Sequence, residues 1–82
     1  YLNDAELSIM PNPAQNFVEV RVDDKYNAFT VSIADIAGRL LLQQNLQQGN
    51  SLISTVDLPN GVYTVWVNAE NKMWSKKLII NK

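Results

Sequence analysis

Apolar residues recur at every second position in several separate runs of this chain. In the clearest run, Val18, Val20 and Val22 are separated by charged residues. Alternation of this kind puts one side of a strand on a core and the other side in water, as in antiparallel sheets. The same period occurs at residues 7–9, 29–33 and 63–67, and no segment has a convincing helical period. The pattern therefore predicts an all-β fold.

Turn-forming residues separate the alternating runs. Pro, Gly, Asn and Asp cluster there, and these residues fix φ, adopt positive φ or form local side-chain hydrogen bonds. The turns recur about every 8–12 residues, a spacing typical of β-sandwiches. We predict a seven-stranded antiparallel Ig-like β-sandwich over residues 6–82, preceded by the end of a linker at residues 1–5. The expected strands are 6–10, 16–23, 28–34, 39–46, 51–58, 62–69 and 73–81.

Some turn residues support more detailed predictions. Gly38, Gly49 and Gly61 stand singly in three turns, where each is expected to occupy a left-handed backbone position. Tyr63 begins a strand just after the turn at residues 58–61. This placement is similar to the tyrosine corner of Ig-like sandwiches, in which the hydroxyl group bonds to the upstream backbone.

The composition argues against catalysis. The chain has no histidine and no cysteine, which removes the commonest general base, the commonest metal ligands and every thiolate. We therefore predict no enzyme activity, no catalytic residue, no cofactor and no metal. Asp23 and Asp24 are adjacent in a turn, where they either form a plain turn or help to hold a calcium ion. A net charge of −1 predicts no nucleic-acid partner.

Trp66 has several alternative roles. Since it alternates with Tyr63, Val65 and Val67, it is expected to point away from the core. Its indole would then pack on a neighbouring strand, contact another protein or stack on a glycan. The sequence leaves these three roles open.

Four local motifs occur in the order of a known family. They are Pro11-Asn12-Pro13, a strand followed by Asp35-x-x-Gly38-Arg39, the element Leu58-x-x-Gly61-x-Tyr63-x-Val65, and the basic-then-apolar strand at residues 76–82. Each motif alone is common, but their order and their spread over nearly the whole chain are specific. On these motifs the chain resembles the C-terminal sorting domains of the type IX (Por) secretion system of Bacteroidetes.

The resemblance implies a function in secretion. It implies that an N-terminal cargo domain of the same precursor crosses the inner membrane by an ordinary signal, folds in the periplasm and crosses the outer membrane. The implied partners are the type IX translocon, outer-membrane shuttle proteins and a sortase-like C-terminal signal peptidase, which usually cleaves near or before residues 1–6. The cargo would then be attached to the cell surface or released. We also expect the chain, which begins with Tyr1, to be a piece of a longer precursor.

Two surfaces are candidates for recognition by the translocon. The terminal strand would offer unpaired backbone groups at a sheet edge and lysines for charge selection. Its residues are Lys76, Lys77, Leu78, Ile79, Ile80, Asn81 and Lys82. The second surface is a pair of turns containing Asp35, Gly38, Arg39, Pro59, Asn60 and Gly61. The residues expected to form structural motifs are Pro11, Asn12, Pro13 and Tyr63.

The candidate residues and the whole domain also have alternative interpretations. Lys76 and Lys77 would instead protect the edge strand, and Asp35 with Arg39 would form an ion pair that stabilises a turn. The whole domain would alternatively be an Ig-like glycan- or surface-binding module, or a structural cap, of a secreted enzyme. Weak self-association through exposed edge strands is a further expectation.

Overall fold

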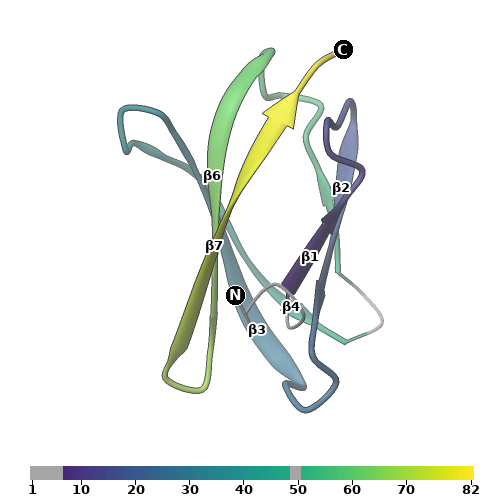
Figure 1. Cartoon of the computed structure of the whole chain (residues 1–82), viewed down its shortest axis with the longest axis vertical. Helices are drawn as coiled ribbons and strands as arrows, with labels where there is room; N and C mark the ends of the chain where they lie inside the picture. Colours follow the sequence, from purple (N-terminus) through teal and green to yellow (C-terminus); the bar gives the residue numbers. More distant parts are fainter. Residues whose placement is uncertain (1–6, 49–50) are drawn as a thin grey trace.

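Two antiparallel sheets pack face to face around the core (Figure 1). The computed structural model describes residues 7–48 and 51–82. Their strands are β1 (Leu7–Met10), β2 (Phe17–Val22), β3 (Ala28–Asp35), β4 (Leu40–Gln47), β5 (Leu52–Ser54), β6 (Gly61–Ala69) and β7 (Lys72–Ile80). One sheet has the order β1-β2-β5, and the other has the order β4-β3-β6-β7. The predicted all-β sandwich of seven strands is confirmed.

Six strands end within one residue of their predicted limits, and β5 does not. The predicted strand over residues 51–58 is wrong after Ser54, because the Leu58 N–H donates to the Thr55 carbonyl oxygen (3.0 Å) and closes a turn. Thr55 is fully buried, and its hydroxyl donates to the Gln15 carbonyl oxygen (3.1 Å). The chain therefore turns across the end of the sandwich. The predicted linker at residues 1–5 lies outside the described residues, as does Gly49.

Alternate residues of both sheets form the core. The fully buried aliphatic side chains of the strands are Leu7, Val18, Val20, Val31, Ile33, Ile53, Val65, Val67, Leu78 and Ile80. Tyr26 and Trp74 complete one end of this core, where their rings meet edge to face with centroids 5.2 Å apart. Trp66 is 39% exposed on the outer face, as the alternation predicts. Every described residue lies in a strand, bridge, turn or coil, and no helix able to cross a membrane occurs among them.

The glycines divide between two backbone conformations. Gly38 has a φ of 88°, so its predicted left-handed conformation is confirmed. The same prediction is wrong for Gly61, which is the first residue of β6 and does not have positive φ. A Cβ atom on Gly61 would lie 3.8 Å from the Tyr63 ring, an ordinary contact distance. Positive φ occurs instead at Glu70 and Asn71 (48° and 70°), in the two-residue turn between β6 and β7.

Candidate recognition surface

The four sequence motifs meet at one end of the sandwich, which we call the motif end. It consists of the connector at residues 11–16, the β3–β4 turn with the start of β4 at residues 35–40, the loop with the start of β6 at residues 55–62 and the end of the chain at residues 77–82. Strand register brings these segments together, because Asp35 pairs with Tyr63, Tyr63 pairs with Leu78, and Ala14 forms a bridge with Ile80. The C-terminus and the start of β6 lie at this end in Figure 1.

Asn12 holds the outer edge of β7. Its side-chain Nδ2 donates to the Lys77 carbonyl oxygen (3.0 Å), and its Oδ1 accepts the Ile79 N–H (3.1 Å). One amide group thereby satisfies a donor and an acceptor of a strand that is more than sixty residues away in the sequence. The proline-flanked motif therefore acts as a clasp on the last strand, in addition to connecting β1 with β2.

Ala14 continues this clasp with its backbone. Its N–H donates to the Ile79 carbonyl oxygen (2.7 Å), and its carbonyl oxygen accepts the Asn81 N–H (2.8 Å). Ala14 is fully buried, so its small side chain is part of the packing at this end. The outward-facing backbone groups from the Lys77 carbonyl to the Asn81 N–H are consequently occupied.

The loop at residues 55–61 fixes the last residue of the chain. The Asn60 Oδ1 accepts the Lys82 backbone N–H (2.9 Å), and the Lys82 Nζ donates to the Val56 carbonyl oxygen (2.7 Å). The Tyr63 hydroxyl donates to the Pro59 carbonyl oxygen within the same loop. The predicted tyrosine corner is therefore confirmed, and it stabilises the loop that holds Lys82.

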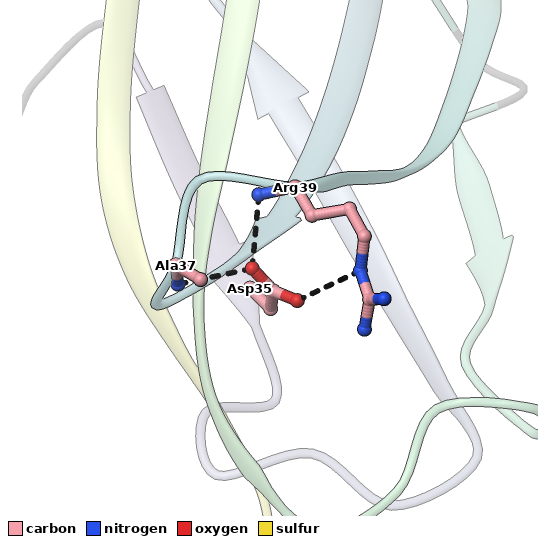
Figure 2. Close-up of polar contacts among 3 residues, drawn as sticks. All are labelled: Asp35, Ala37 and Arg39. Atoms are coloured by element: carbon pink, nitrogen blue, oxygen red, sulfur yellow. Dashed lines mark hydrogen bonds and ion pairs between the residues drawn. The ribbon is translucent and has the colours of Figure 1, made fainter.

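The Asp35 carboxylate organises the β3–β4 turn (Figure 2). Its Oδ1 accepts the backbone N–H groups of Ala37 (3.0 Å) and Arg39 (2.9 Å), and its Oδ2 lies 3.2 Å from the Arg39 Nε. The Arg39 N–H is the largest cause that lowers the pKa of the Asp35 carboxyl below its ordinary value; the Ala37 N–H and the Arg39 guanidinium lower it further. The predicted ion pair between Asp35 and Arg39 is confirmed.

The terminal strand differs in two ways from its sequence interpretation. β7 is an edge strand, as predicted. The expectation of unpaired backbone groups is wrong from the Lys77 carbonyl to the Asn81 N–H, because Asn12 and Ala14 bind the outward-facing groups there. The two adjacent lysines also lie on opposite faces. Lys76 alternates with the buried Trp74 and Leu78 on the inner face and is half-buried, whereas Lys77 is exposed on the outer face.

Several candidate residues are inaccessible to a partner. Leu78 and Ile80 are 0% and 2% exposed, so they belong to the core and support the surface from below.

The motif end also exposes apolar side chains that the sequence analysis did not identify. Ile36 is 84% exposed, Leu40 is 55% exposed and Val62 is 44% exposed. These exposed positions could have been recognised in the sequence, because each is a large aliphatic residue in or next to a turn motif.

Asp23 has a structural role. The Asp23 Oδ1 accepts the Lys25 N–H (3.0 Å), and the Asp23 carbonyl oxygen accepts the Tyr26 N–H (3.0 Å), so Asp23 forms the turn before β3. Among residues 7–48 and 51–82, no three acidic side chains are placed to hold a metal ion together.

Comparison with known proteins identifies the family. A family model described as "Secretion system C-terminal sorting domain" matches residues 8–81, which is nearly the whole chain. The chain belongs to this family. It is therefore a type IX secretion C-terminal sorting domain, and the resemblance seen in the motifs is confirmed. No curated protein matches the chain.

Membership fixes the general function of this sorting domain. It is a signal for export toward the outer membrane, the cell surface or the medium, and it implies interaction with type IX machinery and attachment to an N-terminal cargo. The family is a family of signal domains and not a known enzyme family.

Proposed function

We propose that this domain directs a folded periplasmic cargo through the type IX outer-membrane translocon by presenting its motif end to the export machinery. A cargo that has already folded cannot be recognised as an unfolded peptide, so its signal must be displayed on a surface. The observation that supports the motif end is the convergence of all four family motifs on it, although they are spread from Pro11 to Lys82.

The accessible part of the motif end has the chemistry of a docking patch. We call this part the outer corner, and it contains Ile36, Arg39, Leu40, Val62 and Lys77. Strand pairing connects Leu40 with Ala34, Ala34 with Thr64, and Thr64 with Lys77. Leu40 and Lys77 therefore lie in the same row across the outer face of the sheet. Arginine is enriched at protein interfaces, where an apolar centre is surrounded by a polar rim.

The area of such a patch is compatible with the size of the domain. The chain exposes 5280 Å². A standard interface takes about 800 Å² per partner, which is about a seventh of this surface. Recognition can therefore occupy the outer corner while buried residues such as Leu78, Ile80 and Ala14 only hold its shape.

A graft experiment tests the proposed function. Residues 1–82, fused behind a periplasmic reporter in a type IX-competent host, should bring the reporter to the cell surface. A double substitution at the outer corner, Ile36→Asp with Arg39→Glu, should reduce surface reporter at least about tenfold, which corresponds to about 1.4 kcal/mol of lost binding. Surface reporter is measured by protease accessibility of intact cells.

A matched control separates recognition from general charge effects. Arg21→Glu changes an exposed arginine on the other sheet, where Arg21 pairs with Glu19 (3.4 Å), and it should leave export unchanged. The melting temperature of each isolated variant verifies folding. Normal export of the outer-corner variant would contradict the proposed recognition surface, and a wild-type fusion retained in the periplasm would contradict the sorting function.

Cleavage and transfer of the cargo are a further part of the proposal. We infer that a sortase-like signal peptidase cuts ahead of the folded domain, near or before residues 1–6, after shuttle proteins have received the precursor. The mass of the surface-exposed reporter then decreases by about that of this 9.3 kDa domain. Mass spectrometry of the surface fraction measures the cut, and an intact fusion at the surface would contradict it.

A further inference from the structure

The described residues give this sandwich four edge strands, and three of them are protected. β1 has four residues and β5 has three, and short edges offer little for strand addition. β7 is long, but it carries three lysines and its last part is held by Asn12 and Ala14. Lysines and covering segments are the usual means of preventing edge-to-edge association.

In the part of the chain that the structure describes, β4 has no charged residue, no proline and no covering segment along most of its length. Its sequence is LLLQQNLQ, which contains eight residues without a charge or a proline. One irregularity of register lies near its start, between Ile33 and Ala34 of the partner strand. From Leu42 to Gln47 the ladder with β3 is regular. Within residues 7–48 and 51–82, no strand or backbone group pairs with the other edge of this six-residue stretch.

The backbone direction of each β4 residue follows from the ladder. The Gln48 N–H donates to the Asn27 carbonyl oxygen (3.1 Å), and antiparallel ladders alternate bonded and non-bonded pairs. Leu42, Gln44 and Leu46 therefore direct their N–H and C=O groups to β3. Gln43 and Asn45 direct theirs to the open edge.

The polarity of the segment from Leu42 to Leu46 is symmetric about Gln44. Gln43 and Asn45 are the amide residues on either side of it, and Leu42 and Leu46 are the next residues out. Both leucines are partly buried and pack against the core. In a two-fold antiparallel contact between identical strands, residue i lies opposite residue j and j lies opposite i. With the axis at Gln44, leucine therefore faces leucine and amide faces amide.

We propose that two copies of this chain associate through β4 about a two-fold axis at Gln44, which would join their four-stranded sheets into one. In this register Leu42 lies opposite Leu46 of the second copy, and Gln43 and Asn45 of opposite copies exchange backbone hydrogen bonds. Residues directly opposite each other point to the same face, so the leucines extend the core across the contact. The absence of charge on β4 means that the two identical edges do not repel each other.

Pairing through β4 limits the assembly to two copies. After β4 is paired, the remaining edge of the joined sheet is β7 in each copy, with its lysines and its clasp. The contact is therefore closed and does not propagate into a fibre. Pairing of one short strand is a small interface, so the association is weak and depends on concentration.

Single-cysteine cross-linking tests the register. The chain has no cysteine, so Gln44→Cys introduces a unique thiol at an exposed position. Opposite residues of a non-hydrogen-bonded antiparallel pair have Cα atoms about 4.5 Å apart, which lies within the range of disulfides, about 4.4–6.8 Å. Gln44→Cys should form a disulfide dimer under mild oxidation, whereas Asn68→Cys, exposed on the central strand β6, should not. Equal rates of cross-linking for the two variants would overturn the proposal.

Charge pairing provides a second test that does not depend on oxidation. In Gln44→Lys, two like charges lie directly opposite across the axis, and Gln44→Glu has the same effect with the other sign. Each variant alone should weaken the dimer about fivefold, as measured by sedimentation over a concentration series. An equimolar mixture of the two should recover wild-type association or exceed it, because unlike charges then face each other.

Failure of pairing through β4 can be distinguished from failure of export. A wild-type chain that remains monomeric over the whole series, or a mixture as weak as the separate variants, would overturn pairing through β4. Neither result bears on the sorting function, which is measured by surface reporter. A melting temperature for each variant confirms that Gln44, an exposed residue, is replaced without loss of the fold.

Discussion

The two edge strands of the four-stranded sheet differ in charge, in burial and in the contacts of their outer backbone groups. β7 carries lysines, contributes Leu78 and Ile80 to the core and is held by the Asn12–Ala14 clasp. β4 carries no charge, and its leucines are only partly buried. The difference indicates that β7 is integrated into the fold, whereas β4 is attached to it by one neighbour. A terminal strand that is needed for folding is poorly suited to detach or to accept another strand, so recognition there is expected through side chains.

Substitutions of buried residues should give the largest difference between the edges. Ile80→Ala removes a side chain that is 2% exposed and should lower the free energy of unfolding by about 2–5 kcal/mol. Leu42→Ala, on the half-buried side of β4, should cost about 1 kcal/mol. Urea unfolding of the isolated domain measures both. Similar losses would show that the two edges are equally integrated.

For the same reason, deletion of residues 78–82 should unfold the domain and not merely remove a signal. The deletion takes away Leu78 and Ile80 from the core together with the backbone groups that Asn12 and Ala14 bind. Loss of export after this deletion would therefore not identify the terminal strand as the recognised surface. Circular dichroism of the truncated chain checks this, and a native spectrum would contradict it.

The clasp itself is tested by Asn12→Ala. The substitution removes two hydrogen bonds to β7 and should cost about 1–2 kcal/mol. The Ile79 amide, which donates to Asn12, should exchange its hydrogen faster in the variant. Asn45→Ala on β4 removes one exposed hydrogen bond from Thr30 and should cost about 0.5 kcal/mol or less. An Ile79 amide that remains protected would show that Asn12 does not hold the edge.

The turn that leads into β4 should respond to acid. The pKa of Asp35 is lowered in the folded chain, so its contribution to stability is present at neutral pH. That contribution is lost as pH falls from the unfolded value of about 3.9 through the lower folded pKa. Asp35→Asn should therefore be less stable than the wild type at pH 7, and the gap should narrow below about pH 4. A gap independent of pH would mean that the charge of Asp35 does not matter.

The smallest expected effect concerns the lysine on the outer face of β7. Lys77→Gln should change the free energy of unfolding by less than about 0.5 kcal/mol, since the side chain is exposed. It should also leave self-association unchanged, because the neighbouring backbone groups are already bound by Asn12 and Ala14. Increased association in sedimentation experiments would show that charge, and not the clasp, protects this edge.

The sequence by itself determined the strands and the direction of their side chains. The period of two at Val18–Val22 and around Val65 reflects burial on one face, which is a local property of a pleated strand. The tyrosine corner and the Asp35 turn were also predictable, because their partners lie four residues away. β5 was overestimated because the buried turn at Thr55 has no strong local breaker before Pro59.

Only the tertiary structure decided what the ends and edges do. Asn12 binds residues more than sixty positions away, and nothing local to the proline motif indicates those partners. The same register that gives Asn12 its partners places Lys76 and Lys77 on opposite faces and buries Ile80. Local sequence sets the period of a strand, but strand order decides which edge is clasped and which is left open, because edge hydrogen bonds depend on contacts between distant segments.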